Sequence, residues 1–98
     1  MRNYEVVFVV KPDLEAEATA AVVEKFTRLV TEQGGQVTAV DQWGKKRMAY
    51  EVRKYREGYY VLMQFQGTPA VAQELERVLK ITDEVIRYLI TRLEEEAS

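Results

Sequence analysis

The residues of this chain best suited to bind another molecule lie close together, between Trp43 and Tyr50. In this stretch an aromatic side chain and a glycine precede three consecutive cations, Lys45, Lys46 and Arg47. Three adjacent charges cannot all be buried, because an unpaired charge away from water costs several kcal/mol. Successive side chains of a strand point to opposite faces, so the charge lies on both sides of a strand or in a bend beyond the sheet. In either case these cations face water or an anionic partner.

The composition argues against an enzyme. The 98 residues include no cysteine and no histidine, which removes thiolate metal sites and the commonest general base near neutral pH. Any catalysis would have to use carboxylates, lysines or tyrosines. Gly34-Gly35 follows a predicted helix instead of preceding one, so it does not fit a phosphate-binding loop. We therefore expect no catalytic residue, no metal, no cofactor and no small-molecule substrate.

The charges are unevenly distributed along the chain. The net charge is only −2, which does not suggest a nucleic-acid binder by itself. Residues 45–56, however, carry six cations against the single acid Glu51. The end of the chain carries Glu94, Glu95 and Glu96, and from about residue 94 we expect a frayed, solvated acidic terminus. A local patch of charge matters more than the sum when a partner docks.

The N-terminal residues show no signal peptide, because Met1-Arg2-Asn3 leads directly into a strand pattern. No apolar run approaches the length that spans a bilayer. We therefore expect a cytoplasmic protein with no membrane partner.

The apolar pattern predicts four strands and two helices. The strands are expected at 3–10, 36–52, 59–66 and 85–93, with a bend at Gly44 in the long second strand and a hairpin connection at 54–58. The first helix is expected to begin with Asp13 as its cap, to bury Val22 and Phe26, and to end at Gly34-Gly35. The second is expected to begin with Thr68 as its cap and to have Pro69 in its first turn.

This β-α-β-β-α-β order predicts an α+β fold of the ferredoxin-like, split β-α-β type, as one domain over residues 1–98. Right-handed crossovers place both helices on one face of a four-stranded antiparallel sheet. The first and third strands lie at the centre of that sheet, and its other face is left uncovered.

The chain resembles a known family, the bacterial small-subunit ribosomal protein S-six family. The resemblance covers Met1 to about Leu93, and its most specific part is the run Trp-Gly-Lys-Lys-Arg-Met-Ala-Tyr at 43–50. The other matching elements are Arg2, Tyr4-Glu5, Pro12-Asp13-Leu14, Gly34-Gly35, Gly58-Tyr59-Tyr60 and residues 85–89. One departure is Glu51, where the family usually has proline, and without that proline the second strand is able to pair further.

The resemblance implies a structural function. Such a protein is expected to bind ribosomal RNA of the central domain of the small subunit together with a partner, ribosomal protein S-eighteen. Contacts to phosphate and sugar would fix register without reading bases, and counterion release would make binding weaker at higher salt. The localisation implied is cytoplasmic and ribosome-associated.

Two groups of residues are candidates for these contacts. A basic stripe on the first and last strands, formed by Arg2, Tyr4, Arg87 and Arg92, is a candidate for rRNA binding. The alternative is ordinary surface charge, paired with Glu5 or Glu94.

The second group is a candidate for contact with rRNA or with the protein partner, and its members are Trp43, Lys45, Lys46, Arg47 and Tyr50. For the three cations the alternative is a solvated edge strand on which lysines discourage unwanted pairing. For Trp43 it is a half-buried position packed on Met48 or Tyr50, instead of an exposed anchor.

A different class of function remains open from the residues alone. The fold also suits a small ligand-binding or enzymatic domain that forms a dimer through its bare sheet face. That hypothesis predicts a closed pocket with converging polar groups and a stable homodimer.

Overall fold

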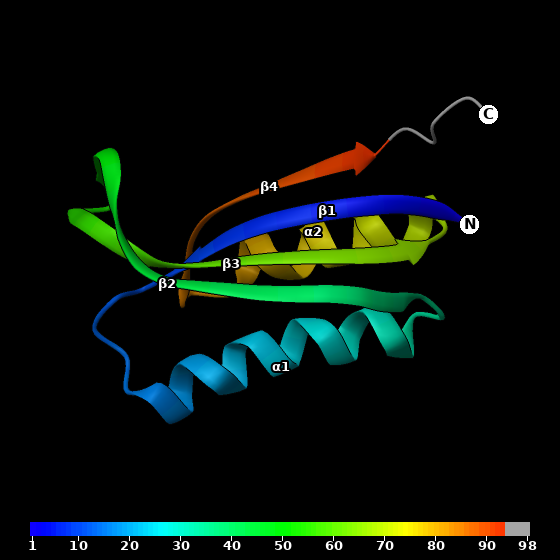
Figure 1. The fold of residues 1–98 in the computed structure, drawn as a ribbon, viewed down its shortest axis with the longest axis horizontal. Coiled ribbons are helices and arrows are strands. Elements are labelled where there is room, and N and C mark those ends of the chain that lie inside the picture. Colours follow the sequence, from blue (N-terminus) through cyan, green and yellow to red (C-terminus); the bar gives the residue numbers. More distant parts are fainter. Residues whose placement is uncertain (94–98) are drawn as a thin grey trace.

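The computed structural model describes residues 1–93, so the expected acidic terminus at Glu94, Glu95 and Glu96 lies outside the described residues. The predicted order β-α-β-β-α-β is confirmed (Figure 1). The elements are β1 (Arg2–Val10), α1 (Ala16–Glu32), β2 (Gln36–Val52), β3 (Tyr55–Gly67), α2 (Pro69–Ile81) and β4 (Val85–Leu93).

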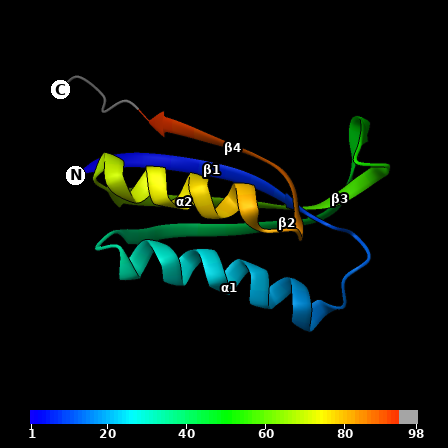
Figure 2. The same cartoon turned by 180° about the vertical axis from the view of Figure 1, so that it is seen from behind.

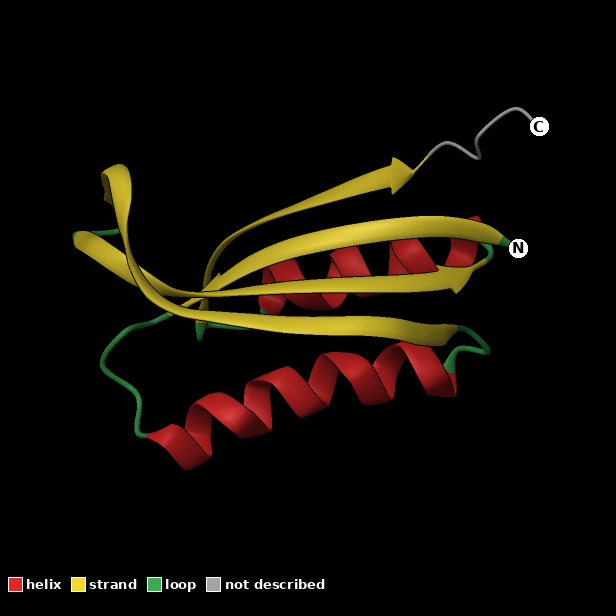
Figure 3. Ribbon diagram, viewed as in Figure 1, coloured by secondary structure: helices red, strands yellow, loops and turns green. Residues whose placement is uncertain are grey.

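The four strands form one antiparallel sheet in the order β2-β3-β1-β4, with β1 and β3 at its centre as predicted. Both helices lie on the same side of the sheet, which is clearest in the view from behind (Figure 2). The other face, here called the open face, carries no helix (Figure 3). The fold class expected from the sequence is therefore confirmed.

The core lies between the helices and the sheet, and strand alternation explains which residues enter it. In β1 every second side chain, beginning at Tyr4, is buried against the helices. The ring of Phe8 meets that of Phe26 from α1 edge to face, with their centroids 5.1 Å apart. From α2, Leu75 and Leu79 complete the layer. Burial of this continuous apolar surface is the main force that holds the helices on the sheet.

Two expected helix caps differ from the structure. The N-cap of α1 is Glu15 and not Asp13, and no side chain caps that end. Asp13 stays exposed in the preceding turn, where the chain conformation lets Leu14 pack against the core. Thr68 does occupy the N-cap position of α2, but its side chain makes no capping hydrogen bond. At the other end of α1, Gly34 has a φ of +89°, as expected for a glycine that ends a helix.

The strands β2 and β3 continue beyond the sheet as a two-stranded ribbon, residues 43–58, which curls away from the helices (Figure 1). It begins at the predicted bend, where Gly44 has a φ of +81° and the register with β3 shifts. The expected connection at 54–58 is wrong, because the turn is only Arg53-Lys54 and β3 already begins at Tyr55. Both turn residues are left-handed, at φ of 50° and 70°, which closes a hairpin in two residues.

Candidate functional site

The layers of this fold differ in charge. Residues 12–33 and 68–84, which contain the helices, carry nine acidic and four basic side chains. The rest of the described chain, which contains the strands and the ribbon, carries ten basic and four acidic side chains. The mild net charge therefore hides a positive strand layer and a negative helix layer, and an anionic partner would be drawn to the former.

On the open face, Trp43 is the centre of an aromatic cluster at the base of the ribbon. The residue is 41% exposed, its ring stacks on that of Tyr60 with centroids 6.4 Å apart, and Lys46 Nζ lies 5.2 Å from the centroid of the Trp43 ring. The indole nitrogen donates a hydrogen bond of 2.8 Å to Asp41. Trp43 thus stacks on Tyr60, a neighbour that was not considered from the sequence, and it offers a partly exposed, fixed ring.

Farther along the ribbon, β2 forms an arch. Arg47 still pairs with Glu57, but Val52 pairs with Tyr55, so four residues of β2 face one residue of β3. The pairing that Glu51 in place of proline would permit is therefore interrupted, and this side chain instead lies 3.8 Å from Arg56.

The arch directs two side chains toward the main sheet. Met48 is buried with Val9 and Ile86 in a small apolar cluster apart from the main core. Tyr50 remains 62% exposed and lies beside Arg87 of β4, whose guanidinium is 5.4 Å from the ring centroid and donates to the hydroxyl at 3.3 Å. Arg87 is therefore held by the ribbon and not by Glu5, which accepts a hydrogen bond from Gln64.

The three consecutive cations at residues 45–47 divide between the two sides of the ribbon. Lys45 pairs in register with Tyr59, which packs against the core on the helix side. Lys46 pairs with Gly58 and faces the open side, where it meets Trp43. All three cations are exposed, Arg47 included. The structure therefore brings Lys46, Trp43, Tyr50 and Arg87 to the open side, and it does not bring Lys45 to them.

The proposed stripe on β1 and β4 is not one surface. Arg87 lies at the ribbon end of β4, opposite Val9, whereas Arg92 lies opposite Tyr4 at the far end. The two arginines are five positions apart along the strand, about 16 Å at the usual rise of a strand. Arg2 and Arg92 instead line one surface hollow of about 640 Å³ beside the start of α2.

Tyr4 differs from the other candidates because its side chain is buried. It is only 6% exposed and stacks on Phe65 in the main core, with ring centroids 5.3 Å apart. Alternation along β1 puts Tyr4 on the same face as Val6 and Phe8, the face that the helices cover. The expectation of an RNA-contacting side chain at Tyr4 therefore conflicts with its packing.

Sequence reasoning missed an apolar row across the open face. Val7 of β1 pairs with Leu62 of β3 on one side and with Leu89 of β4 on the other. Leu89 is 65% exposed, and the other two are half-buried. The alternation of β4 could have predicted that Leu89 faces the open side, because it lies between Tyr88 and Ile90, which pack against the core. A row of this kind suits a protein partner better than a phosphate backbone.

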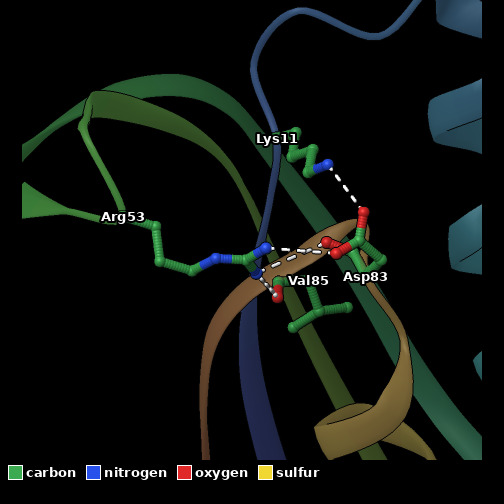
Figure 4. A network of polar contacts seen from close by, with 4 residues as sticks. All are labelled: Lys11, Arg53, Asp83 and Val85. Atoms are coloured by element: carbon green, nitrogen blue, oxygen red, sulfur yellow. Dashed lines mark hydrogen bonds and ion pairs between the residues drawn. The ribbon is translucent and has the colours of Figure 1, made fainter.

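A polar network was also missed, and it ties the tip of the ribbon to the sheet (Figure 4). The Asp83 carboxylate, in the link between α2 and β4, accepts hydrogen bonds from Lys11 at 2.9 Å and from Arg53 at 3.2 Å. These bonds lower the pKa of Asp83, with Lys11 the larger cause, and the same bond raises the pKa of Lys11. No local pattern reveals this network, since Lys11 and Asp83 are 72 residues apart.

Within residues 1–93 no group of three or more acidic side chains is arranged to hold a metal ion, and no helix has the length and apolar character needed to cross a membrane.

Comparisons with known proteins identify the family. Residues 3–92 match the family described as "Ribosomal protein S6". The small ribosomal subunit protein bS6 of Moorella thermoacetica is 88% identical over 98 residues, which is the full length of both chains. The bS6 protein of Heliobacterium modesticaldum is 55% identical over 96 residues, covering 98% of this chain and all of the relative.

A solved structure agrees with this match. The crystal structure of 30S ribosomal protein S6 from Thermotoga maritima superposes with a TM-score of 0.90 at 31% identity, covering 94% of this chain and 87% of that one. The resemblance seen at the Trp43–Tyr50 run thus extends to the whole fold. The chain belongs to the ribosomal protein S6 family, and its role is that of a structural, non-catalytic protein of the cytoplasmic ribosome.

Proposed function

We propose that this protein is a structural component of the small ribosomal subunit that binds ribosomal RNA of the central domain together with ribosomal protein S-eighteen. The observation that carries the proposal is the separation of charge between the layers, joined to family membership. Ten of the fourteen cations lie in the strand layer and ribbon, so the surface that can meet RNA is defined by the fold.

We assign the RNA contacts to cations with exposed side chains. Arg87 and Lys46 lie on the open side of the ribbon, each beside an exposed aromatic ring that fixes its position. Arg2 and Arg92 form a second basic site at the opposite end of β1 and β4. Lys45 and Arg47 belong to the ribbon and extend its positive charge. We leave the buried side chain of Tyr4 out of this assignment.

The protein partner is assigned to the open face. The row Leu62, Val7 and Leu89 gives a continuous apolar strip, and Trp43 with Tyr50 gives exposed aromatic side chains next to it. Aromatic side chains are enriched where protein partners make their strongest contacts. A partner on this face would lie beside Arg87 and Lys46, so protein and RNA contacts would adjoin, which agrees with joint binding.

Filter binding tests this proposal with a central-domain rRNA fragment, with and without S-eighteen, across a salt series. We expect retention that requires both proteins and falls with salt. Arg87→Ala or Lys46→Ala should each reduce the slope of log K against log salt by about one. Lys80→Ala, at an exposed lysine of α2 in the negative layer, is the matched control and should leave the slope unchanged. Equal and negligible retention with and without the partner would refute the proposal.

A further inference from the structure

We propose that Asp83 is a positioning residue, which sets the direction in which the ribbon leaves the sheet and thereby places Tyr50 and Arg87 for binding. The inference rests on the proposed function only for what the ribbon binds. Asp83 belongs to none of the groups assigned above to RNA or to the protein partner, so it would act entirely through other residues.

The geometry of Asp83 joins three separate segments (Figure 4). One carboxylate oxygen, Oδ2, accepts from Lys11 Nζ at the end of β1, at 2.9 Å. The other, Oδ1, accepts from Arg53 Nη2 at the tip of the ribbon, at 3.2 Å. Arg53 Nη1 also donates to the carbonyl of Val85 at 3.2 Å and to that of Asp83 at 3.4 Å. One side chain in the link before β4 therefore joins the ribbon tip to the residue that follows the central strand β1.

The turn that carries Arg53 has an unfavourable backbone conformation, which the contacts of Arg53 help to hold. Arg53 and Lys54 both have positive φ, a conformation that two-residue hairpins usually reserve for glycine and asparagine. L-residues with longer side chains adopt it at a cost, and such positions persist where the surroundings hold them. Here the surroundings of Arg53 are two carbonyl oxygens and the Asp83 carboxylate.

Backbone pairing cannot set the direction of the ribbon by itself. The ladder between β2 and β3 is interrupted between Arg47 and Val52, where the arch inserts its extra residues. Beyond that break three sets of contacts join the ribbon to the sheet: the Met48 cluster, the pair of Tyr50 with Arg87, and the Asp83 network. The Asp83 network acts at the tip, farthest from the bend, where a contact has the most control over the angle at which the ribbon leaves the sheet.

Because Asp83 is exposed, its effect on the position of the ribbon can be tested apart from any effect on the stability of the whole protein. Its side chain is 76% exposed, and ion pairs between exposed side chains contribute little to the free energy of unfolding. Removing the carboxylate charge should therefore leave the sheet and helices folded and mainly release the ribbon.

The deciding measurement is amide hydrogen exchange of residues 43–58 in Asp83→Asn, which keeps the shape of the side chain and removes its charge. We expect faster exchange in the ribbon and unchanged exchange in β1, α1 and α2. The matched control is Asp13→Asn, an exposed aspartate in the turn before α1 that takes no part in the network. Unchanged ribbon exchange in Asp83→Asn would overturn the proposal.

RNA binding gives a second measurement. Loss of one negative charge and loss of the ribbon's position should change the Kd for RNA in opposite directions. Removal of one negative charge alone should tighten binding to RNA, and Asp13→Asn measures that effect. If release of the ribbon leaves it correctly placed in about a tenth of molecules, the apparent Kd of Asp83→Asn should instead rise about tenfold. A Kd that falls as in the control would overturn the positioning role.

A double-mutant cycle with Arg53→Ala completes the test. The two substitutions should each release the ribbon, and the double variant should exchange no faster than Arg53→Ala alone, because Arg53→Ala already removes the contact with the Asp83 carboxylate together with its hydrogen bonds to two carbonyls. Additive effects on exchange would overturn the proposal. If the unsubstituted protein fails to bind RNA with or without its partner, the proposed function falls, while hydrogen exchange still decides the role of Asp83.

Discussion

The main core and the ribbon are held together in different ways. Between sheet and helices, Phe8, Phe26 and Leu75 are completely buried in one continuous apolar cluster. Besides its backbone pairing, the ribbon is held by the small cluster around Met48, the stacking of Trp43 on Tyr60, two aromatic-cation pairs and the exposed hydrogen bonds and ion pairs of Arg53. Apolar burial therefore sets the stability of the whole molecule, whereas contacts that are individually weak set the position of its most basic segment.

This difference explains why the proposed binding residues lie where they do. A charged ribbon packed as tightly as the core would bury its cations at a cost of several kcal/mol each. Extension beyond the sheet keeps Lys45, Lys46 and Arg47 exposed. The consequence is a region whose opening should require less free energy than global unfolding. The predictions that follow test this difference.

The largest effect is expected in the core, for Phe8→Ala. Phe8 is fully buried and meets Phe26 edge to face, so truncation leaves a cavity with little room to collapse. We expect the free energy of unfolding to fall by about 3–5 kcal/mol. Urea denaturation measures it, and a loss below about 1 kcal/mol would show that the core is not the source of stability.

The next effect is expected where the ribbon leaves the sheet, for Gly58→Ala. A Cβ atom at Gly58 would lie 2.1 Å from Cγ1 of Val9, a side chain that has little rotamer freedom. Overpacking of this kind should cost about 1–3 kcal/mol and should speed hydrogen exchange in the ribbon. A variant as stable as the unsubstituted protein, with normal exchange, would mean that the two strands do not approach this closely.

A smaller effect is expected at the bend, for Gly44→Ala. Nothing lies within 4 Å of a Cβ at this position, so the only penalty is the φ of +81°. We expect a loss of about 1 kcal/mol in the same urea experiment. Gly44→Asn is the control, since asparagine tolerates the left-handed region and should recover part of that loss. If Gly44→Ala lost more free energy of unfolding than Gly58→Ala, backbone strain at the bend would cost more than steric overlap at Gly58, contrary to this prediction.

The smallest effect depends on pH and concerns Asp83. The hydrogen bonds from Lys11 and then from Arg53 hold the pKa of Asp83 below its ordinary 3.8. The folded state therefore favours the ionised carboxylate, so this contribution is complete above that value and is lost as pH falls through the folded-state pKa. Thermal midpoints of the unsubstituted protein and of Asp83→Asn should differ slightly at neutral pH and converge below pH 3.8. A gap that does not change with pH would contradict the ion pairs.

Much of the fold could be predicted because its signals are local. Alternation in β1, the helical spacing of Val22 and Phe26, and the glycine at the end of α1 each depend on neighbouring residues. The bend at Gly44 was predictable for the same reason. The cap of α1 was harder to predict, since its position depends on the packing of Leu14 against the core, which the residues around Leu14 do not indicate.

The candidate site was predictable in its residue types but not in its arrangement. The basic run at Lys45–Arg47 and the neighbouring Trp43 are evident in the sequence, yet alternation and the arch decide which of them face the same side. Tyr4 shows the limit of local reading, because its neighbours in sequence are polar and its neighbours in space are Phe65 and the helices.

By itself the sequence determined the order of the elements, the faces that must be buried and the family. The reason is that periodicity, turn residues and the run at 43–50 each lie within a short stretch of the chain. Only the tertiary structure decided that Arg87 meets Tyr50, that Arg2 and Arg92 line a separate hollow, and that Asp83 bonds to Arg53 of the ribbon. The residues brought together in this way lie 30 to 90 positions apart along the chain. Their geometry depends on how the sheet and its bends fold in space, which no short stretch of residues specifies.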